Sequence, residues 1–271
     1  MFESLLGFKD FDKRPERMFL WMFVWAVVIT SIAIFIASQV SVRFSLGGTM
    51  FDTSGLFSVI FIIIPSAYYF TVLIKREERI EEKDIDEFHK KSFWDKHLIH
   101  LLLFLVFFFG VTLAFSVWHF FLDPGFFQVQ EVVINKIQGV SGALTKGNFL
   151  DFQRILGNNL QVTAFAFLFS LFFGAGAVFI LVWNASILGV AIAKISETVW
   201  HIPGASSLFL AHGIIEIGAY IIAGLAGSII SAAVVRKNRS AVLKVILFDS
   251  IKLLVLAIIL VVFGAFVEVY L

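Results

Sequence analysis

Long, uninterrupted apolar stretches recur along the chain, and they constrain its fold more than any other feature. Each is at least as long as the roughly 17–25 residues that an α-helix needs to cross a bilayer. The clear candidates are Met18–Val40, Leu56–Ile74, Leu98–Phe121, Gln161–Trp183, Ser206–Val235 and Leu253–Leu271. Their apolar residues are continuous and do not alternate with polar ones, which excludes the pattern of a transmembrane β-barrel.

The composition leads to the same fold class. Apolar residues make up 59% of the chain and charged residues only 15%, whereas an ordinary globular domain carries about 25% charged residues. A soluble fold cannot cover that much apolar surface with polar groups. We therefore predict an all-α, polytopic transmembrane helical bundle.

Basic residues set the number of spans and their orientation. They concentrate in three segments, which are 1–17, 75–97 and 236–252. Lys- and Arg-rich loops stay on the cytoplasmic side of a membrane. With all three segments inside, Ser206–Val235 can return to the inside only if the borderline segment Asn184–Trp200 also crosses. The sequence thus predicts seven spans in the cell membrane, with the N-terminus inside and the C-terminus outside.

The predicted spans divide the chain into two parts. Residues 1–97 form a two-span extension whose charged segment, 75–97, is interpreted as a solvated helix that serves as a spacer or docks a soluble partner. Residues 98–271 form a five-span membrane domain. Within this domain, two amphipathic stretches, 126–138 and 148–160, lie between the third and fourth predicted spans. They are expected to lie in the headgroup plane, or to cover an outward-facing cavity.

One intramembrane polar cluster is the candidate functional site. His212 and Glu216 are four residues apart and share a helical face, which continues through Tyr220. An ionised carboxylate deep in a span costs at least a few kcal/mol, so Glu216 should be protonated, paired or next to water. Lys194 is the predicted partner, and Asn184 could contribute from the turn that enters the preceding span. A structural hydrogen-bond network, solute or ion binding, and catalysis all remain open.

Small residues spaced by four predict close helix packing. One stripe lies in the Ser206–Val235 span and another in the Gln161–Trp183 span. The two stripes are Ala219, Ala223, Gly227 and Ser231, and Ala166, Ser170 and Gly174. Such stripes let helix backbones approach without a hydrophobic driving force. They are predicted to pack on each other or on a second copy of the chain.

The part of the chain from about Leu98 to the C-terminus resembles the stage II sporulation protein M family. The matching features, in chain order, are Asn158-Asn159, Gly174, Trp183-Asn184, Leu188-Gly189 and the string AHGIIEIGAYIIAGLAGSII, which holds His212, Gly213, Glu216, Gly224 and Gly227. The resemblance implies a five-span core. It also implies the role of a membrane anchor in a complex whose hydrolytic work is done by partner proteins.

Three functions follow as hypotheses. The first is a non-enzymatic scaffold or anchor that binds protein partners or forms a homo-oligomer in the lipid bilayer. The alternatives are a small-solute or ion transporter that uses the His212/Glu216 site, and an intramembrane hydrolase. We find no catalytic motif and no metal-ligand spacing, so no catalytic residue, metal or cofactor is predicted. The chain has no cysteine, and its net charge of +1 gives no basis for a nucleic-acid partner.

Overall fold

The computed structural model describes residues 15–46, 49–86, 93–141, 148–174, 176–235 and 240–270. These residues are almost entirely helical, as expected for backbone that must satisfy its own hydrogen bonds in lipid. The elements are α2 (Pro15–Val40), β1 (Arg43–Leu46), β2 (Thr49–Asp52), α3 (Ser54–Asp86), α4 (Phe93–Trp118), the 3₁₀ turn η2 (Pro124–Phe127), α5 (Gln128–Ser141), α6 (Phe149–Phe173), α7 (Ala177–Ile195), the 3₁₀ turn η3 (Val199–His201), α8 (Ile202–Val235) and α9 (Ser240–Tyr270).

Within the described part of the chain, seven helices are long and apolar enough to cross a membrane. They are Arg17–Val40, Ser54–Val72, Leu98–Trp118, Phe149–Phe173, Ala177–Ile195, Gly213–Val235 and Leu243–Tyr270. The predicted fold class, a bundle of seven transmembrane helices, is confirmed. The segment 184–200, whose crossing was inferred from charge alone, belongs for most of its length to the fifth of these helices.

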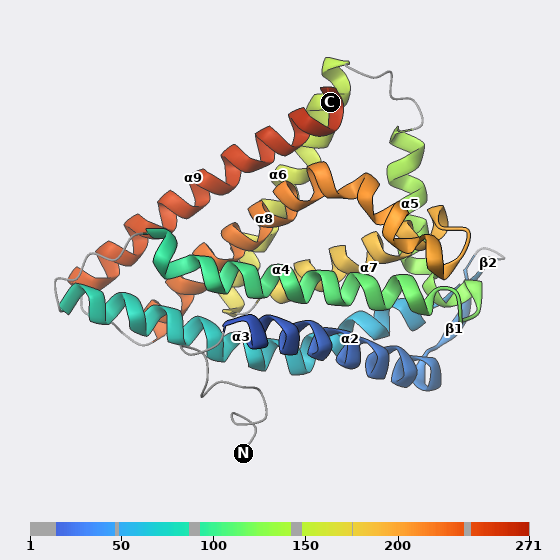
Figure 1. Cartoon of the computed structure of the whole chain (residues 1–271), viewed down its shortest axis with the longest axis horizontal. Coiled ribbons are helices and arrows are strands. Elements are labelled where there is room, and N and C mark those ends of the chain that lie inside the picture. The colour runs from blue at the N-terminus through green and yellow to red at the C-terminus, as the bar shows by residue number, and fades with distance from the viewer. Residues whose placement is uncertain are drawn as a thin grey trace.

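The helices form two groups that differ in how they pack. The first group comprises α2, α3, α4 and α7, which run side by side in Figure 1, and the second comprises α6, α8 and α9. Aromatic side chains make up much of the core of the first group, where Phe70 stacks on Phe104 with ring centroids 4.1 Å apart. The core between α8 and α9 is instead rich in alanine, including Ala223 and Ala257. The two groups meet where α8 contacts α7, α3 and α4.

The boundaries around α6 correct two predictions. The stretch 148–160, expected on the membrane surface, is the first part of α6, and the predicted span 161–183 does not exist as one helix. α6 ends at Phe173, and the chain turns at Gly174, whose φ of 68° lies in the left-handed region that favours glycine. α7 begins at Ala177. Gly174 and Gly176 therefore lie between two helices, whereas the predicted span 161–183 ran through both.

Four further elements differ from the predicted boundaries. Residues 43–52 form a short antiparallel hairpin that pairs Arg43 with Asp52 and was not predicted. α3 continues to Asp86, so the first half of the charged segment 75–97 is helical. α8 begins at Ile202, four residues before the predicted span Ser206–Val235. α9 begins at Ser240, thirteen residues before the predicted start of the last span.

The hairpin, α5 and η3 all lie at one end of the bundle in Figure 1, and the ends of α3 and α8 lie at the other. α5 contacts α7 and α3 and follows η2 directly. Its residue Ile134 and the preceding Phe126 and Phe127 are buried. The predicted amphipathic stretch 126–138 therefore packs on the protein itself.

Candidate functional site

A cavity of about 260 Å³ lies where the two helix groups meet, bounded by α4, α5, α6, α7 and α8. Its apolar lining includes Phe108, Ile134 and Ile217. Its polar lining comes from three helices and consists of Asn158 and Asn159 on α6, Asn184 on α7, and Glu216 and Tyr220 on α8. A concave, mostly apolar space with a few convergent polar groups is typical of a small-molecule site.

A chain of hydrogen bonds fixes the polar wall of this cavity. The Tyr220 hydroxyl donates to Asn159 Oδ1 at 2.8 Å, and Asn159 Nδ2 donates to Glu216 Oε1 at 2.5 Å. Asn158 Nδ2 also donates to Asn159 Oδ1, at 3.3 Å. Asn159 and Tyr220 are each only 5% exposed. Because both ends of the Asn159 amide are engaged, this residue orients the Glu216 carboxyl group.

A second carboxyl group, that of Glu268 on α9, lies near Glu216 and interacts with it electrostatically. Gly264 of α9 leaves room for the Glu216 side chain, because a Cβ on that residue would lie 2.8 Å from Glu216 Cγ. Three helices, α6, α8 and α9, thus position the Glu216 carboxyl group.

The structure gathers part of the polar cluster predicted from the sequence. Glu216, Tyr220 and Asn184 line one cavity, and Asn184 lies in the middle of α7, where its Nδ2 donates to Ile180 O at 2.7 Å. Asn184 was expected in a turn, but α7 begins at Ala177 and so carries it into the helix. His212 belongs to α8, but its side chain lies outside the described residues.

Lys194, the predicted partner of Glu216, lies elsewhere. It is in the last turn of α7, where its Nζ is 3.5 Å from Asn135 Oδ1 and 4.0 Å from Glu131 Oε1, both on α5. The early start of α7 carries Lys194 to the end of the bundle that holds α5. Glu216 instead uses Asn159 and Glu268, neither of which the sequence analysis assigned to the cluster.

The two small-residue stripes pack against each other, with α6 on α8. A Cβ on Gly227 would lie 2.3 Å from Phe167 O and 3.1 Å from the Ser170 Cβ, and the Gly174 backbone faces Ser231. Ser228 Oγ donates to Gly174 O at 2.6 Å, which ties α8 to the turn after α6. These contacts hold Asn159 beside Tyr220 and Glu216.

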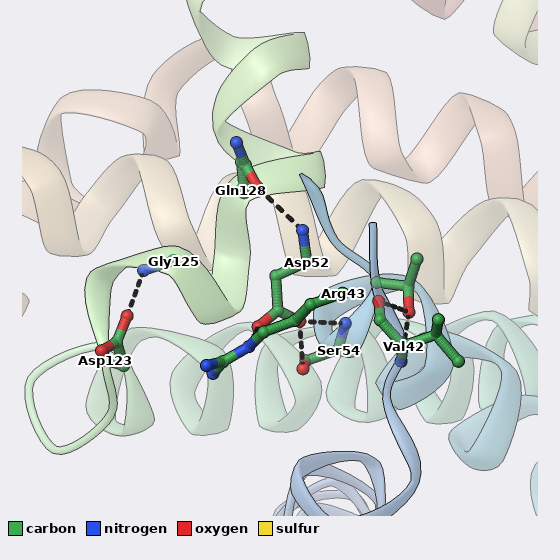
Figure 2. A network of polar contacts seen from close by, with 8 residues as sticks. Val42, Arg43, Asp52, Ser54, Asp123, Gly125 and Gln128 are labelled. Carbon is green, nitrogen blue, oxygen red and sulfur yellow. Dashed lines mark hydrogen bonds and ion pairs between the residues drawn. The ribbon is translucent and has the colours of Figure 1, made fainter. Parts of the chain in front are cut away.

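A polar network joins the hairpin, the start of α3 and the start of α5 at one end of the bundle (Figure 2). Arg43 Nε donates to Asp52 Oδ2 at 2.7 Å, Ser54 donates to Asp52 Oδ1 through both its backbone N–H and its hydroxyl, and the Asp52 N–H donates to Gln128 Oε1 at 2.9 Å. Burial opposes the ionisation of Asp52, but the Ser54 and Arg43 donors outweigh it and lower the pKa of Asp52 below its usual value. Gln130 Nε2 donates to Gly55 O at 3.0 Å, so α5 is fixed to the start of α3.

Among the described residues, no three His, Cys, Asp or Glu side chains converge in a way that could hold a metal ion. The polar groups of the cavity are amides, one phenol and the Glu216 carboxyl group. These groups can bind a solute by hydrogen bonds.

Seven apolar helices, four of which line a cavity that holds a few polar groups, define a polytopic helical membrane protein. The family model described as Stage II sporulation protein M matches residues 99–271, and the chain belongs to that family, as its resemblance suggested. An uncharacterized protein of Methanocaldococcus jannaschii is 36% identical to it over 124 residues, which cover 44% of this chain and 70% of that protein. No solved structure matches the chain.

Proposed function

We propose that this chain binds a small polar solute in the cavity between α6, α7 and α8. The observation that carries the proposal is the hydrogen-bonded series Tyr220–Asn159–Glu216, which is held in place beside an open space of about 260 Å³. A network that only fixed the register of the helices would need no such space, because its groups satisfy one another. A group oriented by two neighbours and facing a cavity is arranged for a ligand.

The contacts of the small-residue stripes bear on the scaffold hypothesis. In the sequence these stripes favoured assembly, since they could have packed on a second copy of the chain. In the structure α6 and α8 use them for each other. Docking through 75–97 stays a prediction, because most side chains of that segment lie outside the described residues. The polar cavity therefore supports solute binding better than assembly.

We place this site in the cell membrane, facing outward. The cavity is bounded by α5, which lies at the same end of the bundle as the hairpin 43–52. The basic segment 75–97 begins within the last part of α3, and the segment 236–252 follows α8; both of these helix ends lie at the opposite end of the bundle. Because basic loops remain cytoplasmic, this orientation supports the N-terminus inside and the C-terminus outside.

A thermal-shift experiment tests the proposal. Purified protein in lipid nanodiscs would be heated in the presence of small amines, alkali cations, polyols and zwitterions. We expect one class to raise the Tm of the wild type, and Glu216→Gln to abolish that increase because it removes the carboxyl group but keeps the side-chain volume. Glu197→Gln is the matched control, since Glu197 is exposed and does not line the cavity.

The outcome is decisive in both directions. An increase in Tm that disappears in Glu216→Gln and persists in Glu197→Gln supports binding in the cavity. If no class stabilises the wild type, or if Glu216→Gln responds as the wild type does, the cavity is not a solute site and the network only joins the helices.

A further inference from the structure

A second cavity, of about 210 Å³, lies against the part of α8 between Ile202 and Ile217. Its walls come from α2, α4, α7 and α8 and are almost wholly apolar, with Phe23, Leu113 and Ile214 among them. Two of its hydroxyls are already bonded to backbone carbonyls. Ser116 Oγ donates to Gly189 O at 2.8 Å, and Ser206 Oγ donates to Ile202 O at 2.7 Å. The space that remains suits a hydrocarbon chain.

The polar and the apolar cavity are neighbours. Four residues line both of them, namely Leu188, Phe209, Gly213 and Ile217. Gly213 has no side chain, and a Cβ built on it would meet no atom within 4 Å. The two spaces are therefore separated by a single layer of side chains with an unfilled position at Gly213.

The apolar cavity also lies next to the lipid-facing surface. Ile214 lines it and is 41% exposed on the part of α8 that spans the membrane. A molecule dissolved in the bilayer can thus reach the apolar cavity without passing through water. Taken together, the two cavities fall within the range of about 300–1,000 Å³ that is usual for small-molecule sites.

The polar cavity sets the chemistry of the other end of the ligand. Asn159 donates one N–H to Glu216, and its oxygen accepts from Tyr220 and Asn158. Asn184 donates one N–H to Ile180 O, which leaves its carbonyl oxygen for a ligand. The acceptors offered are thus the Asn184 carbonyl and the Glu216 carboxyl group, and each amide keeps a second N–H. These groups fit a head group such as an amine or a polyol, which donates hydrogen bonds.

We infer that the ligand is a single-chain amphiphile whose hydrogen-bond-donating head, an amine or a polyol, lies in the polar cavity and whose hydrocarbon chain lies in the apolar one. The inference rests on the proposed function of the polar cavity and names its ligand class. Gly213 is then the point through which the ligand passes from one cavity to the other.

The test uses four probes on the protein in nanodiscs. Dodecylamine and dodecylglycerol carry the chain, and ethylamine and glycerol offer the heads alone. Binding of the chain probes would be measured by native mass spectrometry, and stabilisation by the head probes from the Tm. Gly213→Leu fills the connection. Gly218→Leu is its matched control, since it makes the same change on the same helix, also in open space, and lines neither cavity.

We expect Leu113→Phe, which fills the apolar cavity from α4 and does not line the polar one, to weaken binding of at least one dodecyl probe by about tenfold or more and to leave the matching head probe unaffected. Gly213→Leu should give the same loss of dodecyl binding, and Gly218→Leu should change neither. If head probes bind in a Glu216-dependent manner but both cavity-filling variants retain dodecyl binding, the amphiphile inference is wrong and the proposed function stands. If neither head nor dodecyl probes bind the wild type, both are wrong.

Discussion

Gly227 lies where the backbones of α6 and α8 are in contact, and replacing it with alanine tests that contact. The Cβ of Gly227→Ala would lie 2.3 Å from the Phe167 carbonyl oxygen. An ordinary contact between these atom types needs about 3.3–3.6 Å, so the two helices must separate by about 1 Å. A gap of that size removes about a quarter to a half of the dispersion energy at each contact that it opens. Close contact of this kind is what holds helices together in lipid.

Gly218→Ala is the matched control, because a Cβ at Gly218 meets nothing within 4 Å. Both variants replace glycine with alanine within α8 and gain the same helix propensity. The difference between their free energies of unfolding therefore reports the contact at Gly227. We expect Gly227→Ala to be less stable than Gly218→Ala by about 1–3 kcal/mol, the usual effect of overpacking. The free energy of unfolding would be measured by steric trapping in lipid bicelles.

A third variant sharpens this measurement. Adding Ser170→Gly to Gly227→Ala should not restore stability, because the shortest contact is with a backbone oxygen that no side-chain change removes. If Gly227→Ala were as stable as Gly218→Ala, α6 and α8 would not pack through Gly227, and the position of Asn159 beside Glu216 would have no support.

Three further predictions concern the ends of the bundle. The chain has no cysteine, so a single introduced cysteine reports on which side of the membrane it lies. Ser45→Cys should react with an impermeant maleimide in intact cells, and Lys83→Cys should react only after lysis. Equal labelling of both would contradict the proposed orientation. The pKa of Asp52 is lower in the folded protein than its unfolded value of about 3.8, so the stability it provides is complete at neutral pH and is lost as the pH falls below that value. In thermal melts Asp52→Asn should accordingly have a lower Tm than the wild type at pH 7, and its Tm should fall less on acidification to pH 3. Parallel curves of Tm against pH for the two proteins would contradict this. Lys194→Ala removes a partly exposed ion pair with Glu131, so the free energy of unfolding should change by about 0–1 kcal/mol and solute binding should persist. A loss of binding like that of Glu216→Gln would mean that Lys194 belongs to the site.

The spans were predictable because continuous apolar runs and charge parity depend on local sequence alone. The start of α6 was not, and the reason is physical. Asn158, Asn159 and Gln161 made the chain look as if it entered the membrane at residue 161, because polar residues usually mark a span boundary. Asn159 is polar because it faces an internal cavity and Glu216. A polar group that serves a site within a bundle has the same signature in the sequence as a loop.

The remaining differences have two causes. The sequence between α6 and α7 contains only glycine and alanine, which do not interrupt an apolar run, so the predicted span continued through it. Glu268 and Glu216 are brought together only by the packing of α9 on α8, which no local pattern reveals. Glu268 nevertheless left a signal, since it is the only charged residue in the predicted span Leu253–Leu271 and lies four residues after Gly264 on the same helical face.

The location of the cavities follows from the way the two helix groups pack. α6 and α8 are in backbone contact at Gly227, and α4 and α7 approach each other closely at Gly189, where a Cβ would lie 2.6 Å from Thr112 O. α7 belongs to the first group but meets the second, where a Cβ on Gly224 of α8 would lie 2.4 Å from that of Ala177. α8 is therefore tightly packed near Gly224 and Gly227 and loosely packed one to three turns earlier, around Gly213, where both cavities lie. The loosely packed turns also carry Glu216, so the polar group that is hardest to accommodate in a membrane occurs where the packing leaves room for a ligand.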